Sequence, residues 1–304
     1  MTPELFAKLL GIKTKDLSKS CIDFIGKKDF RFNIANDSKR ENLILKALKI
    51  VDSGELSISG KHKKDVWEKG WKENLDEFHE SENLSDLIPK FVRNNQPVRL
   101  GGKDYIYPRS KNFETNFVTL LRIYLFEKYF FNISELHEFG CGTGLNLVAL
   151  AKMFPKSQLN CYDWVQSSVD ILNSLREKYG YNIRGHLFDM FKPDSKIKIN
   201  EGGVFTIGAM EQLGSNYNTF LKFLITQKPS IVINVETIYE LYNSDILFDY
   251  VSIRYLEARN WLQGYYKDLL DLEKNKIIKI HDVKRPFGSF FHDGYTFIVW
   301  EPLI

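Results

Sequence analysis

The residues with the clearest chemical potential form a short glycine-rich run, Glu138 to Gly144, with the sequence EFGCGTG. A segment typical of a strand precedes this run, and a segment typical of a helix follows it. Glycine permits positive φ and lets a ligand approach the backbone, and the first turn of a helix offers N–H groups without intrahelical partners. Such a turn at the carboxyl end of a strand is where α/β sheets bind nucleotide-like ligands. The run therefore predicts a cofactor site.

The spacing of the glycines decides between several nucleotide-binding motifs. The dinucleotide motif Gly-x-Gly-x-x-Gly fails, because its third glycine position falls on Leu145 or on Leu147. The chain also contains no Gly-x-x-x-x-Gly-Lys phosphate loop. The remaining pattern is Glu-x-Gly-x-Gly-x-Gly, formed by Glu138, Gly140, Gly142 and Gly144. This pattern resembles the first motif of the class I S-adenosylmethionine-dependent methyltransferases, which have a Rossmann-like fold.

Two later segments extend the resemblance. Asp163 ends a predicted second strand, 19 residues after Gly144, and in the family an acidic residue at this point binds both ribose hydroxyls of S-adenosylmethionine. A carboxylate suits this role, because its two oxygens match the two donors of a cis-diol. Asp189 ends a predicted third strand, and in the family an aspartate at this point often contacts the adenine amino group. Suitable apolar neighbours for the adenine ring are Trp164, Met190 and Phe191.

Each of these features also has a purely structural interpretation. A glycine-rich turn can simply connect a strand to a helix, and Asp163 can cap the helix that is predicted to start near Val165. Asp189 lies just before a Lys-Pro pair and can be a turn residue. Trp164 can belong to the core. The methyltransferase interpretation is preferred because three elements occur together in the expected order and at the expected separations.

Composition favours a cytoplasmic enzyme. The chain has 304 residues, enough for a methyltransferase domain and an additional segment. A net charge of +3 with scattered basic residues argues against a nucleic-acid partner. The three cysteines (Cys21, Cys141 and Cys161) lack a metal-binding spacing, and their odd number fits a reducing compartment. No stretch approaches the length of a membrane span. We therefore expect neither a metal nor a membrane partner, and a homodimer is left open.

The first third of the chain, residues 1–110, is predicted to be a mainly helical segment ahead of a cofactor-binding domain, residues 111–304. Apolar residues recur at helical spacing over 3–10, 15–25, 38–51 and 65–79. The last of these ranges carries one stripe, Trp67, Trp71, Leu75 and Phe78. A stripe of this kind usually belongs to a core, and here it either packs on the catalytic domain or forms a lid. An acceptor-binding or interaction role for the segment is also open.

A hairpin is predicted around Gly101-Gly102, and a long amphipathic helix over 113–131 follows it. In the methyltransferase family, the segment before the first strand of the sheet frequently folds over the cofactor. The resemblance therefore implies that Tyr105 and Arg109 meet the methionine end of the cofactor, with Arg109 paired to its carboxylate. The alternative is a surface hairpin with an exposed arginine.

From residue 135 onward, strands and helices alternate, which predicts a parallel, doubly wound α/β sheet. The predicted strands cover 135–139, 159–163, 182–190, 204–208 and 231–235, with helices over 145–153, 167–178 and 217–225 and more between 244 and 274. The β-branched run 231–235 is typical of a strand buried on both faces. Two final strands, 276–283 and 295–300, are separated only by a loop. They predict a seven-stranded, mostly parallel sheet with a terminal antiparallel hairpin, as the resemblance also implies.

Candidate catalytic residues follow from the rule that ligands of such sheets bind beyond the carboxyl ends of the strands. Glu211 follows the fourth strand, Glu236 follows the fifth, and His292 lies in the loop between the last two. A hydroxyl acceptor needs a base, best one with a pKa near neutrality, to remove its proton. We therefore expect the base to be Glu236, His292 or Glu211, in the order in which the topology lets them reach the acceptor. The alternative for Glu236 is a charge at a helix N-terminus.

Missing motifs narrow the choice of methyl acceptor. Enzymes of the family that methylate exocyclic amines of nucleic acid bases carry Asn/Asp-Pro-Pro-aromatic after the fourth strand, where this chain has Gly208-Ala209-Met210-Glu211. An aromatic-rich rim with a few carboxylates suits a small polar or sugar-like molecule. The sequence therefore favours S-adenosylmethionine-dependent O-methylation of a small metabolite with a sugar-like or nucleotide-linked structure. A small-molecule N-methyltransferase, an aminopropyl transferase and a non-catalytic cofactor-binding subunit are the alternatives.

Overall fold

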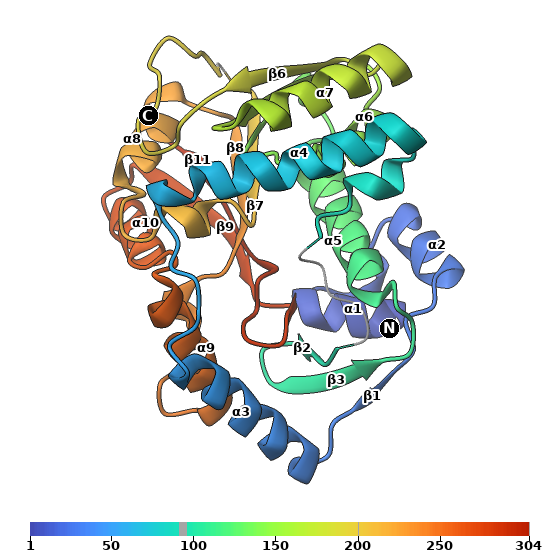
Figure 1. Ribbon diagram of the computed structural model, residues 1–304, viewed down its shortest axis with the longest axis vertical. Helices are drawn as coiled ribbons and strands as arrows, with labels where there is room; N and C mark the ends of the chain where they lie inside the picture. Colours follow the sequence, from blue (N-terminus) through green and yellow to red (C-terminus); the bar gives the residue numbers. More distant parts are fainter. Residues whose placement is uncertain (91–95, 200, 304) are drawn as a thin grey trace.

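A seven-stranded sheet forms the centre of the fold (Figure 1). The computed structural model describes residues 1–90, 96–199 and 201–303. Across the sheet the strands follow the order β6-β5-β4-β7-β8-β11-β9. Their bounds are β4 Glu135–Phe139, β5 Gln158–Asp163, β6 Ile183–Leu187, β7 Gly203–Ile207, β8 Ile231–Glu236, β9 Ile278–Lys284 and β11 Thr296–Pro302. Strands β4 to β8 pair in parallel, whereas β11 is antiparallel to both β8 and β9. The predicted fold class is confirmed.

Helices cover both faces of this sheet. On one face lie α5 Phe113–Tyr129, α6 Leu145–Met153 and α7 Gln166–Tyr179, and on the other lie α8 Asn218–Gln227 and α10 Tyr265–Lys274. All six residues of β8 are buried. Ile233 packs into the core beside α5, whereas its neighbour Val232 packs into the core beside α8. Because successive side chains of a strand point to opposite faces, one apolar strand stabilises both layers.

The N-terminal segment combines helices with a small sheet. Its helices are α1 Pro3–Leu10, α2 Lys19–Lys27, α3 Asp37–Asp52 and α4 Lys64–Ser81. The small sheet has the order β1-β3-β2-β10, with β1 Phe32–Ile34, β2 Val98–Leu100, β3 Asp104–Pro108 and β10 Phe287–Gly288. Strand β10 comes from the loop between β9 and β11. Phe6 of α1 packs edge-on against Phe117 of α5, with ring centroids 5.9 Å apart. Residues 1–110 therefore share a hydrophobic core with the rest of the chain.

Local structure differs from the sequence prediction in a few places. Residues 15–25 are not one helix: a 3-10 turn ends at Asp16, and the hydroxyl of Ser18 accepts the N–H of Cys21 at 3.2 Å to cap α2. Strand β6 ends at Leu187, before Asp189. The hairpin is confirmed, because β2 and β3 pair around Gly101 and Gly102, whose φ angles are +61° and +68°. The two-residue strand β10 is too short to have a periodicity that sequence can reveal.

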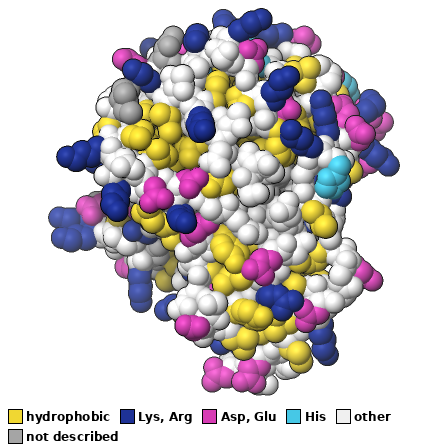
Figure 2. Space-filling view, turned by 90° about the vertical axis from the view of Figure 1, so that its left-hand side faces the viewer, with side chains coloured by type: hydrophobic (Ala, Val, Ile, Leu, Met, Phe, Trp, Pro, Cys, Tyr) yellow, Lys and Arg dark blue, Asp and Glu magenta, His cyan; other side chains and the backbone are white. Residues whose placement is uncertain are grey.

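One face of the molecular surface carries basic and acidic side chains interspersed with apolar ones (Figure 2). Basic side chains do not form a uniform stripe on this face. Within the ranges given above, no helix is long and apolar enough to cross a membrane. Cys21, Cys141 and Cys161 are buried free thiols.

Candidate active site

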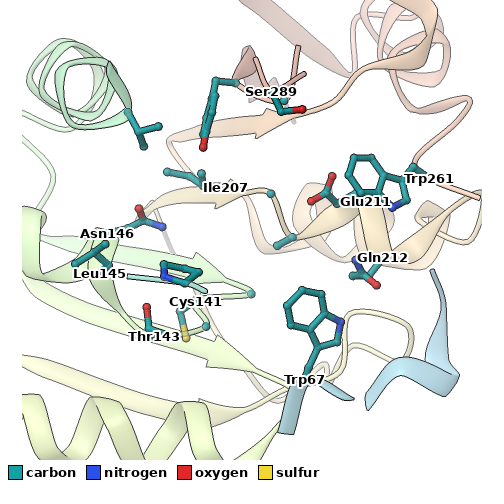
Figure 3. A pocket seen from close by; sticks show the side chains of 18 of the residues that line it. Trp67, Cys141, Thr143, Leu145, Asn146, Ile207, Glu211, Gln212, Trp261 and Ser289 are labelled. Carbon is teal, nitrogen blue, oxygen red and sulfur yellow. The ribbon is translucent and has the colours of Figure 1, made fainter. Parts of the chain in front are cut away.

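A cavity of 690 Å³ lies at the carboxyl ends of the central strands, the edge where such sheets bind ligands. We call one side the glycine-turn half, which comprises residues 140–143, 145 and 146 together with Arg122, Asp163, Trp164, Phe188, Met190 and Phe191. We call the other side the Glu211 half, which comprises Glu211, Gln212, Tyr255, Arg259, Trp261 and His292. Figure 3 shows Thr143 and Asn146 in the first half and Glu211 and Trp261 in the second. Helices α4 and α5 and the loop 287–295 complete the wall.

The glycine turn has the backbone that its sequence predicts. Gly140 and Gly142 have φ of +75° and +51°, which disfavours any residue with a side chain. A Cβ at Gly140 would overlap the side chain of Ala209, and one at Gly142 would lie 3.0 Å from the indole of Trp71. The turn is also fixed from outside, because the hydroxyl of Thr143 donates to the carbonyl oxygen of Leu87 at 2.6 Å. Both glycines therefore permit close packing around the cavity.

Asp163 lies beside this turn and lines the cavity. Its Oδ2 accepts the N–H of Gly142 at 2.9 Å, and its Oδ1 accepts the N–H of Val165 at 3.4 Å. Burial raises the pKa of Asp163 to about 6, and the backbone hydrogen bonds oppose that shift. Asp163 is not the cap of α7, because the N–H groups of Gln166 and Ser167 donate to the carboxylate of Glu68 on α4 at 2.8 and 3.0 Å.

The wall next to Asp163 is aromatic. Trp164 and Phe191 stack with ring centroids 5.9 Å apart, and both line the cavity together with Met190. Asp189 is exposed and is not part of the wall. Its carboxylate accepts the N–H of Phe191 at 2.8 Å, which is the turn role that the sequence left open. The expectation that the Asp189 side chain reaches the ligand is therefore corrected.

Glu138, the first residue of the glycine motif, is fully buried behind the wall. Its Oε1 accepts a hydrogen bond from the side-chain amide of Asn146 at 2.5 Å, and within the described ranges its Oε2 has no hydrogen-bond partner. Burial raises the pKa of Glu138 to about 8, so the group is mostly neutral at pH 7. The Arg122 guanidinium of α5 lines the cavity nearby, and its Nε is buried without a hydrogen-bond partner among the described residues. The glycine-turn half thus contains a buried guanidinium beside the cavity.

Two residues predicted to meet the cofactor lie elsewhere. Tyr105 is fully buried, and its hydroxyl donates to the carbonyl oxygen of Phe290 at 2.9 Å. Arg109 is exposed, and its Nη2 donates to the side chain of Asn33 at 3.1 Å. Neither lines the cavity. The expected positions of Tyr105 and Arg109 are therefore wrong, because the hairpin packs on β1 and β10 and not over the glycine turn.

The Glu211 half contains a pair of interacting carboxyl groups. Glu211 lines the cavity, whereas Glu236 lies behind the wall and accepts the N–H of Ala209 at 3.1 Å through Oε1. Burial raises the pKa of Glu236 to about 7, and burial together with the charge of Glu236 raises the pKa of Glu211 well above its ordinary value. Two such carboxyl groups cannot both ionise readily. We expected Glu236 to reach the ligand more readily than Glu211. This order is corrected, because Glu211 lines the cavity and Glu236 does not.

His292 lines the same half, as part of an aromatic cluster. Its ring stacks on Tyr255 and contacts Trp261 edge-on, with centroid distances of 5.3 and 4.8 Å. Burial lowers the pKa of His292 to about 3, so the imidazole is neutral and a weak base at physiological pH. The Arg259 guanidinium lies 5.0 Å from the ring centroid of Trp261, and its Nη1 donates to the hydroxyl of Tyr255 at 3.2 Å.

A buried ionic cluster supports the loop 287–295 from behind. Arg99 of β2 and Arg285 both pair with Asp293, at 3.3 and 2.7 Å, and Arg285 also pairs with Asp249 of α9 (Leu247–Arg259) at 2.7 Å. Arg99 and Asp293 have no exposed surface. The positive charges hold the pKa of Asp293 below its ordinary value despite burial. This cluster ties the loop that carries His292 to the N-terminal hairpin.

The sequence does not identify several residues of the cavity wall, because it predicts a helix without showing which face of that helix lies inward. Helix α5 presents Glu114, Val118 and Arg122 to the cavity, at spacings of one helical turn. The sequence predicts an amphipathic helix here, but buried residues lie on several sides of α5, so the pattern does not reveal which polar residues face the cavity. Trp67 of the aromatic stripe also lines the cavity, whereas Phe78 belongs to the core. The stripe therefore contributes both to the core and to the wall of the cavity, and its role as a lid stays a prediction.

Comparisons with known proteins give structural neighbours only, since no family model and no curated protein matches the chain. An O-methyltransferase (NcsB1) from neocarzinostatin biosynthesis, solved with S-adenosylmethionine and 2-hydroxy-5-methyl naphthoic acid, has 13% identity and a TM-score of 0.42 over 63% of this chain and 58% of that chain. PigF, solved with S-adenosylhomocysteine, has 14% identity and a TM-score of 0.46 over 86% and 69%. The 4+2 cyclase SpnF has 12% identity and a TM-score of 0.48 over 75% and 76%.

The strand order itself, and not these distant neighbours, defines the fold. The glycine turn follows β4, which lies between β5 and β7 where the strand order reverses. The last strand, β11, is inserted antiparallel between β8 and β9. A parallel sheet closed by an antiparallel hairpin is the arrangement that the resemblance implied. The chain has the class I methyltransferase fold.

Proposed function

We propose that this protein binds S-adenosylmethionine in the glycine-turn half of the cavity and transfers its methyl group to a hydroxyl group of a small polar acceptor in the Glu211 half. One observation carries the proposal: the glycine turn, the Asp163 carboxylate and the Arg122 guanidinium line one side of a single cavity. A ligand that fits this side needs donors for Asp163 and an anionic group for Arg122.

The residues of the glycine-turn half suit the parts of S-adenosylmethionine. The Asp163 carboxylate would accept the two ribose hydroxyls, and Trp164, Met190 and Phe191 would contact the adenine ring. The Arg122 guanidinium, whose Nε is buried without a partner among residues 1–90, 96–199 and 201–303, would bind the methionine carboxylate. A dinucleotide suits the site less well, because its pyrophosphate requires the Gly-x-Gly-x-x-Gly turn that this sequence lacks.

The bound cofactor would supply an electrophilic methyl group on a positively charged sulfur. The protein's own contribution is to position the acceptor in line and to exclude water. Trp67 and Trp71 of α4, with ring centroids 5.3 Å apart, cover the glycine turn and reduce the access of water to it. On the other side, the loop 287–295 closes the wall of the cavity.

The Glu211 half supports a sugar-like acceptor. Glu211, Gln212 and Arg259 each carry a planar group with two or more hydrogen-bonding atoms, which suits neighbouring hydroxyls. Trp261 offers an apolar face beside them (Figure 3). Glu211 also favours a second candidate, N-methylation of a small amine, because a carboxylate at the wall can hold an ammonium group. Either reaction would make this a small-molecule enzyme, and a non-catalytic cofactor-binding role predicts no turnover of any acceptor.

The test is calorimetric titration of the purified chain with S-adenosylmethionine, S-adenosylhomocysteine and NAD. Micromolar binding of the first two, without binding of NAD, supports the proposed cofactor. Binding of NAD alone, or of none of them, would overturn the proposal. Extracts of small metabolites and defined sugars would then be screened with radiolabelled methyl donor, and separate sets of alcohols and amines would distinguish the two candidate reactions.

A further inference from the structure

A pair of polar side chains from distant parts of the chain meets at the cavity wall. Glu114 lies in the first turn of α5, and Tyr295 directly precedes β11. Both line the cavity, and the Tyr295 hydroxyl donates to Oε1 of Glu114 at 2.9 Å. Since the phenol proton is directed to the carboxylate, the phenol oxygen can act only as an acceptor toward a ligand.

Glu114 is poorly solvated and short of partners. Its Oε2 is buried and has no hydrogen-bond partner in the part of the chain that the structure describes. Burial raises the pKa of Glu114, and the hydrogen bond from Tyr295 opposes this shift. Burial and the neighbouring Glu114 both raise the pKa of Tyr295. The other charged groups facing the pair are Arg122, farther along α5, and Glu211 of the 3-10 helix Met210–Leu213.

The pair lies where the two halves of the cavity meet. Arg122 influences the ionisation of both Glu138 and Tyr295, whereas Glu211 influences Tyr295 from the other side. Tyr295, Arg122 and Ile207 also border a small void of 10 Å³ next to the main cavity. A methyl donor in the glycine-turn half and an acceptor in the Glu211 half would meet in this region.

We propose that Glu114 and Tyr295 form the proton-accepting pair of this site and that the positive charge of the bound cofactor readies it. This inference rests on the proposed function. The acceptor hydroxyl gives its proton to the Tyr295 oxygen, and the Tyr295 proton passes to Oε1 of Glu114. In the same reaction the acceptor oxygen forms a bond to the methyl carbon, and the carbon–sulfur bond breaks with its electron pair left on sulfur. Charge balances, because the sulfonium becomes neutral as the Glu114 carboxylate becomes a carboxylic acid.

The charge of the cofactor provides a test that needs no acceptor. A positive sulfur near Glu114 favours the ionised carboxylate and lowers its pKa, so binding of S-adenosylmethionine should release a proton. S-adenosylhomocysteine has the same carboxylate and ammonium groups but a neutral sulfur. The difference in proton release between the two ligands therefore isolates the response to the sulfonium charge from the responses of Glu138 and Asp163 to the shared parts of the ligands.

The experiment measures binding enthalpies of both ligands in buffers with different ionisation enthalpies, over a pH series. We expect greater proton release with S-adenosylmethionine than with S-adenosylhomocysteine in the wild-type protein. The difference should disappear in Glu114→Gln. It should persist in the matched variant Glu211→Gln, which removes the other carboxylate facing Tyr295. Tyr295→Phe, which removes the donor to Glu114 and leaves its carboxylate more often protonated, should increase the difference.

Each outcome decides between the inference and its alternatives. Equal proton release with both ligands in the wild-type protein, or an unchanged difference in Glu114→Gln, would overturn the inference while leaving the proposed cofactor intact. Loss of the difference in Glu211→Gln alone would assign the response to Glu211. If Glu114→Gln fails to fold, an unchanged difference in Tyr295→Phe overturns the inference instead. If neither ligand binds the wild-type protein, the proposed function fails as well.

Discussion

Replacing Asp163 with alanine tests the cofactor site most directly. The side chain is almost fully buried and lies against the glycine turn, where Oδ2 accepts the N–H of Gly142 at 2.9 Å. In the proposed complex its two oxygens would accept the two ribose hydroxyls. A hydrogen bond to a charged group contributes about 1.5–3 kcal/mol. We expect a net loss of about 2–4 kcal/mol in binding free energy, a decrease of roughly 30-fold to several hundredfold in affinity.

The same substitution has a structural cost that must be separated from binding. Without the carboxylate, the buried N–H of Gly142 loses its acceptor, which costs about 1–3 kcal/mol of unfolding free energy. The matched variant Asp163→Asn keeps the shape and one acceptor oxygen, so it should lose affinity with less loss of stability. Calorimetric affinity and the midpoint of thermal unfolding, measured on the same samples, distinguish the two effects.

The pH dependence of affinity adds an independent check. The Asp163 carboxyl has a pKa of about 6 in the protein without ligand. Ribose donors favour the ionised form, so the pKa should fall on binding. The contribution of Asp163 to affinity should therefore be nearly constant above pH 6 and should weaken as the pH falls through that value, because binding must then displace a proton from this carboxyl group. Asp189→Asn, at an exposed position outside the wall, is the control and should leave affinity unchanged. An unchanged affinity in a folded Asp163→Ala protein would show that Asp163 only supports the turn.

Three further predictions concern the groups around the cavity. Arg122→Gln should weaken S-adenosylmethionine binding at least tenfold, and Arg109→Gln should not. If calorimetry gives the two variants equal affinities, Arg122 does not bind the methionine carboxylate. Glu68→Ala should lower the unfolding free energy by about 1–2 kcal/mol in denaturant titration, because two N–H groups of α7 lose their cap. The same variant should release S-adenosylhomocysteine faster, as measured by tryptophan fluorescence. A dissociation rate equal to that of the wild-type protein would show that the contact of α4 with α7 does not retain the ligand. Arg99→Met should cost about 3–5 kcal/mol of unfolding free energy, because the fully buried Asp293 loses one of its two cationic partners. Arg254→Met, which removes an exposed ion pair with Asp52, should have a far smaller effect in the same denaturant titration.

Sequence alone predicts the parts of this protein that depend on local pattern. The β-branched run of β8 identifies a strand buried on both faces, and the glycine motif fixes the turn after β4. The carboxylate of Asp163 follows from strand polarity and motif spacing, and the structure brings it to the cavity. Glu211 and His292 reach the wall for the same reason, since both lie in segments that leave the carboxyl edge of the sheet.

The errors arise where tertiary packing selects one side of an element. Strand polarity brings both Glu211 and Glu236 to the carboxyl edge, but only the packing of residues 208–211 over β8 shows that Glu236 lies behind the wall. The hairpin was expected to cover the cofactor, yet pairing with β10 directs Tyr105 into a separate core. Arg109 and Arg122 illustrate the same point. Both are arginines before β4, and only the inward face of α5 determines which one reaches the cavity.

The N-terminal segment completes the site, and this follows from contacts that no motif predicts. Glu68 of α4 accepts two N–H groups of α7, and Trp71, one helical turn later, packs against Gly142. Thr143, in the turn itself, donates to the carbonyl oxygen of Leu87 just beyond α4. These contacts join the segment to the glycine turn and to the helix after Asp163. Movement of α4 would therefore change the backbone that would hold the cofactor, so cofactor binding and docking of the N-terminal segment should stabilise each other.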